Sequence, residues 1–382
     1  MRMAVTTRRF NVAFATVALT TLACLALAAP PAVARRDATA LWPGRAVAAE
    51  QRFGRGGQSF GGGGQSGGEG RQSGGEGRQS GGGGGQNFDN VEVHLQPAQG
   101  NVYMLVGAGG NVTLQIGKEG VLIVDTQYAP MSSKLLAAIH TISQGPLRYI
   151  INTHSHPDHV GGNENMKKAG ATIAGGNVAG DIGDAAQGAQ IISHINAYKR
   201  MSARVNGLFA TPPAAWPTST FLGEDKKLYF NGEGVHVIHQ PSAHTDGDSI
   251  VFFRKSDVIS SGDIFTTTNY PVIDLNAGGN ISGVISGLNR IVDLCIPVYG
   301  QEGGTMVIPG HGRLSDIGDV INYREMATIV RDRIQDMVKK GMTLEQVKAA
   351  RPTRDYDPVY GATTGVWTTD MFVEAVYRSL KT

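Results

Sequence analysis

Short runs of alternating apolar and polar residues dominate the chain from about residue 91 onward. Runs at 91–95, 102–106 and 112–116 have glycine-rich turns between them, which predicts an antiparallel meander. The next run, at 121–124, is apolar throughout and ends at Asp125, as is typical of a strand buried on both faces. Further strands are expected at 148–152, 171–174, 227–230, 235–238, 249–253, 258–260 and 305–308.

Segments with helical periodicity lie between and after these strands. Helices are predicted at 132–142, 163–169, 185–201 and 281–294. Apolar residues three and four positions apart then form one stripe over 319–340, and Thr343 with Gln346 makes a capping box for another helix. Since helix and sheet blocks alternate, we expect an α/β protein with helices packed outside stacked sheets and a helical extension at the C-terminus.

The first 34 residues have the order of an export signal. A basic start with three arginines precedes an apolar run from 12 to 29, and Ala-Val-Ala at 32–34 suits removal. The alternative is a membrane anchor, but the run is rich in alanine and threonine and ends in two prolines. We therefore expect export to the periplasm or the exterior, with no stable membrane insertion after cleavage.

Residues 35–90 are of low complexity. Of the 53 glycines, 18 fall between Gly54 and Gly85, and GGEGRQS occurs twice in succession. Glycine maximises unfolded-chain entropy and has no side chain to bury, so a flexible tether is expected, with a binding role for its arginines as the alternative. The folded part then comprises a catalytic domain over 91–315 and the extension over 316–382.

Charge and cysteine content argue against a nucleic-acid-binding protein and against a fold stabilised by disulfides. The formal charge is +2, and without the three arginines of the first 34 residues 31 basic and 32 acidic residues remain, a charge of −1. This balance gives no electrostatic basis for nucleic-acid binding, so a small-molecule substrate is expected. Cys24 lies in the signal, which leaves Cys295 without a disulfide partner. No pattern specifies an oligomeric state.

The densest polar cluster is the sequence HSHPDH at 154–159, directly after an apolar run. On an extended segment His154 and His156 point to one side, and Pro157 forces a turn that returns Asp158 and His159 toward the same point. A single histidine is more often a satisfied polar group, but three of the chain's ten histidines lie within these six residues. Imidazole and carboxylate together predict a zinc site, with iron or manganese as alternatives.

Three further candidate ligands each follow an apolar run. They are His244 in PSAHTDGD, Asp263 at the end of VISSGD and His311 in PGHG. Loops that follow strands are where a rigid scaffold presents ligands. Taken alone, Asp263 could be a turn residue and His311 a loop histidine. His239 competes with His244, but it lies inside an expected strand, so His244 is preferred.

In this order, the residues resemble the ligands of the metallo-β-lactamase-fold hydrolases. The match runs from about residue 91 to 315 and fills every ligand position. The resemblance implies a four-layered αβ/βα sandwich with two metals at one edge between the sheets. It also implies one Zn²⁺ held by His154, His156 and His244, and a second held by Asp158, His159 and His311, with Asp263 bridging. Asp125 matches the acidic residue that orients the site from behind the ligands.

The implied reaction is hydrolysis by an activated water. Two cations about 3.5–4 Å apart share a water, lower its pKa and orient the resulting hydroxide toward a polarised carbonyl. The second cation stabilises the leaving group. Asp158 is a candidate for steering the water or accepting its proton. Tyr270, close after Asp263, is either a hydrogen-bond donor to the oxyanion or a packing residue.

Departures from the family pattern narrow the reaction class. The binuclear β-lactamases have cysteine or serine where this chain has Asp263, so the ligand set is more similar to hydroxyacylglutathione hydrolase, lactonases and ribonuclease Z. Export and near-neutral charge argue against a ribonuclease, and the C-terminal segment resembles an exported branch of the superfamily. We predict a zinc-dependent hydrolase of a small ester, thioester, lactone or lactam. The alternatives are an exported β-lactamase, a mononuclear iron persulfide dioxygenase and a metal-binding scaffold without catalysis.

Overall fold

The computed structural model describes residues 87–171, 188–295 and 304–381. Every described residue belongs to one compact unit, 77–382. The predicted export signal, most of the tether and nearly all of the predicted strand at 171–174 therefore lie outside the described residues. No helix within the described ranges is both long enough and apolar enough to cross a membrane.

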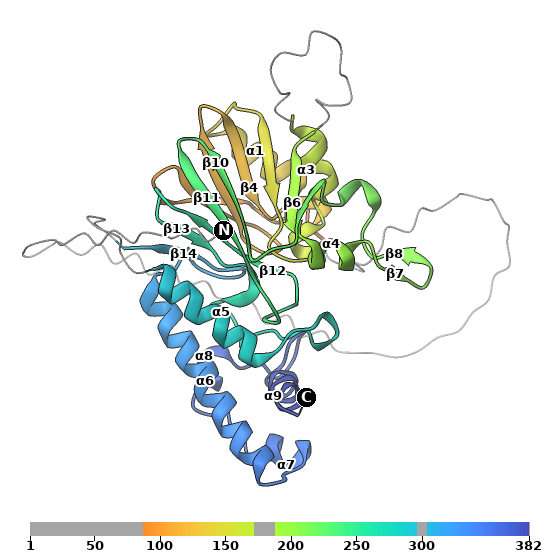
Figure 1. The fold of residues 1–382 in the computed structure, drawn as a ribbon, viewed down its shortest axis with the longest axis vertical. Helices are drawn as coiled ribbons and strands as arrows, with labels where there is room; N and C mark the ends of the chain where they lie inside the picture. Colours follow the sequence, from red (N-terminus) through yellow and green to blue (C-terminus); the bar gives the residue numbers. More distant parts are fainter. Residues whose placement is uncertain (1–86, 172–187, 296–303, 382) are drawn as a thin grey trace, which may run out of the picture. The chain divides into compact units, whose positions relative to one another are not determined.

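One sheet comes from the first half of the described chain, in the order β1-β2-β3-β4-β5-β6-β9 (Figure 1). Its strands are β1 (His94–Gln99), β2 (Val102–Val106), β3 (Val112–Gly117), β4 (Gly120–Val124), β5 (Leu147–Ile151), β6 (Gln190–His194) and β9 (Ser219–Phe221). Every residue of β4 is buried, as its continuous apolar run predicts. Because β4 and β5 pair in parallel, the loops that follow both strands leave the sheet at the same edge.

The second sheet has the order β10-β11-β12-β13-β14 among the described residues. Its strands are β10 (Asp225–Phe230), β11 (Glu233–Gln240), β12 (Asp248–Phe253), β13 (Val258–Ser260) and β14 (Met306–Ile308). Both β11 and β13 run antiparallel to β12, and β13 pairs with β14 in parallel. The ends of β11, β13 and β14 therefore lie at one edge, and these strands precede the other three candidate ligands.

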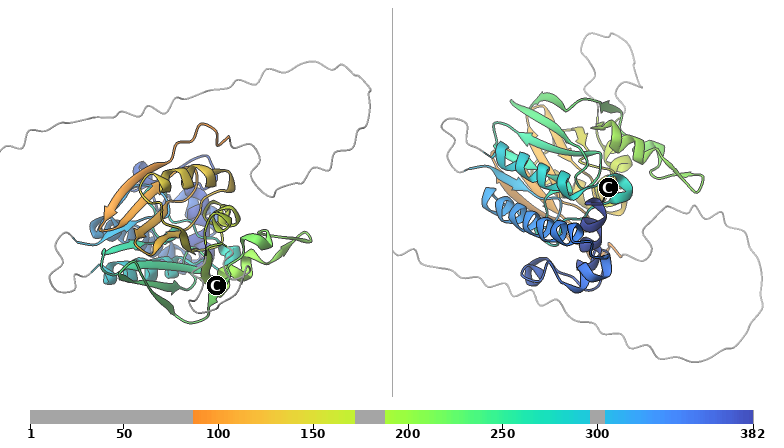
Figure 2. Two further views of the ribbon diagram at one scale, coloured as in Figure 1. Left: turned by 90° about the horizontal axis from the view of Figure 1, so that it is seen from above. Right: turned by 60° about the horizontal axis from the view of Figure 1, so that its bottom comes forward.

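Three apolar cores confirm the four-layered αβ/βα sandwich. One core lies between the sheets, where Leu122 and Ile151 of the first meet Val251 of the second. Another covers the outer face of the first sheet with α1 (Ser132–His140) and α3 (Asn163–Ala169). The third covers the outer face of the second sheet with α5 (Ile281–Leu294) and the C-terminal helices. Figure 2 shows helices on both outer sides of the paired sheets.

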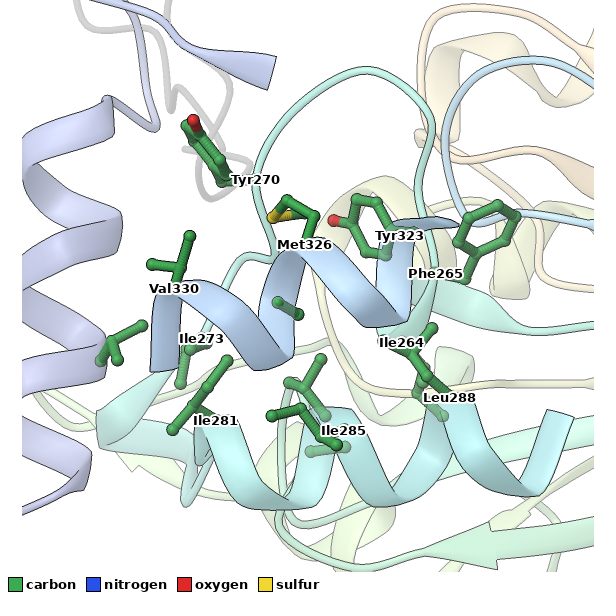
Figure 3. Close-up of a cluster of buried hydrophobic side chains, with 14 of the residues drawn as sticks. Ile264, Phe265, Tyr270, Ile273, Ile281, Ile285, Leu288, Tyr323, Met326 and Val330 are labelled. Carbon is green, nitrogen blue, oxygen red and sulfur yellow. The ribbon is translucent and has the colours of Figure 1, made fainter. Parts of the chain in front are cut away.

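The C-terminal extension packs against α5. It contains α6 (Ile317–Lys339), α7 (Leu344–Ala349), α8 (Asp357–Tyr360) and α9 (Thr369–Ser379). The predicted apolar stripe of α6 belongs to the buried cluster that also contains the apolar side of α5, and Figure 3 shows Tyr323, Met326 and Val330 of α6 in this cluster. The capping box formed by Thr343 and Gln346 starts α7, as the sequence predicts.

Two predicted boundaries are wrong. The helix predicted at 185–201 is limited to α4 (Ile195–Met201), because residues 190–194 form β6 instead. The branched side chains of Ile191 and Ile192 are buried there, and pairing with β5 and β9 overrides the helical periodicity. The first strand begins at His94 rather than Val91, since pairing with β2 starts at that residue.

Candidate metal centre

Loops at the ends of four strands bring the seven predicted ligands together. His154 and His156 follow β5, and Asp158 and His159 lie on the one-turn helix α2 (Pro157–Val160). Pro157 opens that turn, which the hydrogen bond from Gly161 N to Pro157 O (2.8 Å) closes. The proline therefore reverses the chain as the sequence predicts. His244, Asp263 and His311 follow β11, β13 and β14 respectively.

The inward-facing atoms form three overlapping groups, each with its ligand atoms within 4.8 Å of one another. These groups are His154/His156/His244, Asp158/His159/His311 and His154/His159/Asp263. Asp263 lies between the first two groups. Its Oδ1 is 3.1 Å from His159 Nε2, and its Oδ2 is 3.7 Å from His244 Nε2 and 3.6 Å from His311 Nε2. One carboxylate therefore reaches a ligand atom of each set.

Asp125 supports the centre from behind His159. Its carboxylate accepts hydrogen bonds from Thr153 N (2.8 Å), from the Thr153 hydroxyl (2.7 Å) and from His159 Nδ1 (2.8 Å). With Nδ1 donating to Asp125, the neutral His159 ring has its lone pair on Nε2, which faces the other ligands. Asp125 has a φ of 66°, a strained conformation that its fixed surroundings maintain.

Asp274 is a functional candidate that sequence reasoning missed. Its Oδ2 lies 3.0 Å from His156 Nε2, so His156 presents Nδ1 to the cluster, 2.8 Å from His244 Nε2. His244 is oriented in turn by donating from Nδ1 to Val272 O (2.7 Å). Asp274 and Val272 lie in one loop after Asp263, and a lone acid in a loop gives no signal by which the sequence could have identified it.

Electrostatics favours neutral rings at His154 and His244 and an ionised carboxylate at Asp263. Burial, together with the neighbouring His159 and His244, holds the pKa of His154 well below its usual value. Burial also lowers the pKa of His244 to about 4. Burial opposes ionisation of Asp263, but His159 and His311 outweigh it and hold the carboxyl pKa well below its usual value. Neutral imidazole and ionised carboxylate are the forms that bind metal.

The second set carries protons that a cation would displace. Burial opposes charge on both rings, yet the carboxylates of Asp263 and Asp125 raise the pKa of His159 well above its usual value. In the same way Asp263 and Asp158 raise the pKa of His311 to about 9. Metal binding at this set would therefore release protons, because a coordinating imidazole nitrogen must be unprotonated.

Two observations show that the residues fit a bound cation. Within the described residues, His154 Nε2 is buried without a hydrogen-bond partner, a costly arrangement for a native polar atom unless something else satisfies it. Glycine also lines the ligands closely: a Cβ at Gly110 would overlap the His159 ring, and one at Gly310 would overlap Asp263 Oδ1. Imidazole nitrogens and carboxylate oxygens form a donor set that suits zinc, iron or manganese.

Tyr270 and His239 do not join this cluster. The Tyr270 ring is 1% exposed, and its hydroxyl lies 2.9 Å from Asp357 Oδ1 and 3.1 Å from Thr353 O. The suggestion that Tyr270 donates to an oxyanion is therefore wrong, because that hydroxyl is bound within the C-terminal extension. His239 lies in β11, where its Nε2 donates to the carbonyl of Asp246 (2.9 Å), so His244 is the better candidate.

A curated protein and several solved structures are similar to this chain. A curated relative, the linear primary-alkylsulfatase of Pseudomonas sp. (strain ATCC 19151), is 24% identical over 274 residues, which cover 63% of this chain and 50% of the relative. The chain thus spans about half the length of that relative.

Solved structures of two kinds are similar in fold. The stereoselective inverting sec-alkylsulfatase Pisa1 from Pseudomonas sp. gives a TM-score of 0.53 at 15% identity, over 75% of this chain and 50% of that one. A metallo-beta-lactamase from Pontibacter korlensis gives a TM-score of 0.47 at 15% identity, over 62% of this chain and 99% of that one. The model of the metallo-beta-lactamase superfamily matches residues 105–311, a range that includes all seven candidate ligands. Since that range exceeds half of the chain, the protein belongs to the metallo-beta-lactamase superfamily.

Proposed function

We propose that this protein is a binuclear metal-dependent hydrolase that cleaves a small ester, thioester, lactone or lactam. The observation that carries the proposal is the position of Asp263, whose two oxygens lie within 3.1–3.7 Å of ligand nitrogens from both histidine sets. A carboxylate placed between two groups of ligands is suited to bridging two cations. Zinc is the expected metal, with iron or manganese as alternatives.

The protein's own groups bind, orient and move protons. Bound cations would supply a water that is nucleophilic at neutral pH and a Lewis acid for the substrate oxygen. One cation would be held by His154, His156 and His244. The other would be held by Asp158, His159 and His311, and Asp263 would contact both cations.

Asp158 is the candidate proton acceptor. Its side chain is 23% exposed against 10% for Asp263, so it is the more accessible carboxylate among the ligands. Its Oδ2 is already 3.2 Å from His311 Nε2. Because Asp125 and Asp274 fix their imidazole partners beforehand, little reorganisation would accompany the reaction.

Sulfate esters are a second candidate substrate class. The curated relative and one similar fold with a TM-score above 0.5 are both alkylsulfatases. Both classes need an activated water and a stabilised leaving group, so the metal centre alone does not separate them. The discriminating product is inorganic sulfate, which only a sulfate ester releases.

Metal analysis and a substrate panel test the proposal together. We expect about two zinc ions per chain and turnover of at least one of nitrocefin, a thioester and a lactone. Sulfate release from a linear alkyl sulfate, without turnover of the other three, would establish the second candidate instead. A single iron would favour persulfide oxygenation, and bound metal with no turnover would favour a scaffold.

The bridging position has a test of its own. Asp263→Asn should weaken the binding of both metals, while the buried Asp257→Asn, whose carboxylate accepts only from Thr305 (2.9 Å) among the side chains described, should weaken neither. Equal metal content in the two variants would refute bridging.

A further inference from the structure

The segment 265–280, which directly follows Asp263, contacts three other candidate ligands. Val272 O accepts the hydrogen bond from His244 Nδ1 (2.7 Å), and Asp274 binds both His156 Nε2 (3.0 Å) and, through its backbone N–H, the carbonyl of His244 (3.0 Å). On the other side of the centre, the Thr267 N–H donates to His311 O (3.1 Å). The position of this segment therefore sets the orientation of two of the three residues in the first set.

This segment has little regular structure to hold it in place. Apart from the single turn η4 (Leu275–Ala277), it forms neither helix nor an extended strand. A loop without a hydrogen-bonded ladder depends more than a strand or helix does on contacts with its surroundings. These contacts therefore decide how firmly the first set is held.

Backbone hydrogen bonds hold the two ends of the segment to the catalytic domain, and side chains of the C-terminal extension hold its middle. The Tyr270 hydroxyl lies between Thr353 O and the Asp357 carboxylate, and its ring stacks on Phe372 of α9, with centroids 4.6 Å apart and planes at 5°. The Tyr323 hydroxyl of α6 donates to Asn269 O (3.0 Å). Figure 3 shows Tyr270 and Tyr323 within the apolar cluster over α6.

We propose that Tyr270 is a positioning residue through which the C-terminal extension fixes the first metal-ligand set. The inference rests on the proposed metal centre. Tyr270 holds the 265–280 segment from its outer side, and Val272 and Asp274, two and four residues later, hold His244 and His156 from its inner side. Removing the Tyr270 hydroxyl should loosen the segment and with it the first set, while the Asp125-supported ring of His159 keeps its orientation.

The chain contains a matched control. Tyr377 is another buried tyrosine of the same apolar cluster, and its hydroxyl donates to Met342 O (3.0 Å), entirely within the extension. Tyr270→Phe and Tyr377→Phe make the same chemical change in the same layer, but only the first breaks an anchor of the 265–280 segment. Tyr323→Phe breaks a different anchor of that segment and provides a second variant should Tyr270→Phe fold poorly.

The experiment measures the metal site of the full-length protein rather than its activity. Apo-protein is titrated with zinc against a chromophoric chelator, and the visible spectrum of the cobalt-substituted protein is recorded. We expect Tyr270→Phe to bind the first zinc about tenfold more weakly, because loss of a residue that supports metal ligands from outside generally lowers metal affinity. The substitution should also shift the cobalt absorption bands. Tyr323→Phe should change both readouts in the same direction, and Tyr377→Phe should change neither.

The possible failures are distinguishable. If the wild type binds zinc and Tyr270→Phe matches Tyr377→Phe in affinity and cobalt spectrum, the positioning role is overturned and the metal centre stands. A wild-type protein that binds no zinc would overturn the metal centre and this inference together.

Discussion

Replacing Asp125 by asparagine should weaken the binding of one cation more than that of the other. Asparagine has nearly the size of aspartate and tolerates the left-handed backbone conformation, so the φ of 66° is preserved. Its amide oxygen can still accept from Thr153 N, as Asp125 Oδ1 does now (2.8 Å). The change therefore falls on the oxygen that faces His159, which becomes an NH₂ group.

The new NH₂ group is a hydrogen-bond donor and faces His159 Nδ1, which is itself the donor in the wild-type protein. His159 Nδ1, now 2.8 Å from Asp125 Oδ2, can no longer donate, and the ring is driven toward the tautomer with its proton on Nε2. Nε2 is the atom that faces Asp158 and Asp263, so the proton occupies the ligand position.

The magnitude follows from the bonds lost. A hydrogen bond to a charged group contributes about 1.5–3 kcal/mol and a neutral one about 0.5–1.5 kcal/mol, so the fold should lose on the order of 1–2 kcal/mol. Loss of an outer support typically costs about 10–100-fold in metal affinity. This corresponds to roughly 1.4–2.8 kcal/mol at the Asp158/His159/His311 set.

Two measurements on the apo-protein check this prediction. Competitive zinc titration separates the two dissociation constants, and thermal unfolding followed by circular dichroism gives the stability loss. We expect the larger weakening for the second cation, because Asp125 contacts His159 directly (2.8 Å), whereas it reaches the first set only through the Thr153 hydroxyl, which lies 3.0 Å from His154 Nδ1. Wild-type values for both constants, or weakening of the first cation alone, would refute the tautomer argument.

Two other substitutions test the centre at different points. Asp274→Asn tests the first ligand set as Asp125→Asn tests the second. Hydrogen bonding to His156 holds the pKa of Asp274 at about 2, so its carboxylate is charged at neutral pH. Loss of that charge should weaken binding of the first cation by about tenfold in the same titration. Gly310→Ala places a methyl group against Asp263 Oδ1 and should weaken both cations and lower the melting temperature through overpacking of about 1–3 kcal/mol. Gly223→Ala, where a Cβ meets nothing within 4 Å, is its control, and equal zinc content in the two glycine variants would contradict the close approach.

Some of the centre is predictable because its signal is local. His154, His156, Asp158 and His159 lie within six residues, and a proline between them defines the turn. His244, Asp263 and His311 are recognisable because each follows a short apolar run, and strand ends in a layered α/β fold meet at common edges. In each case a pattern of a few residues carries the information.

The features that the sequence did not predict depend on contacts between residues far apart in the chain. Asp274 and His156 are 118 positions apart, and neither residue's neighbours indicate the other. Tyr270 shows the reverse error, because its closeness to Asp263 in sequence suggested a place in the site, whereas its hydroxyl binds Asp357, 87 residues later. At residues 190–194 the side chains suit either a helix or a strand, and only pairing with β5 decides between them.

The two ligand sets are supported by different parts of the fold. His159 rests on Asp125, which is 2% exposed at the end of β4 and belongs to the first sheet. His156 rests on Asp274, whose side chain is 29% exposed in a loop that the C-terminal extension anchors. An opening of the extension would therefore disturb the first set while the core that supports the second stays closed. It follows that the first cation should exchange more readily than the second, and that the C-terminal helices, although distant in sequence, are a structural part of the centre.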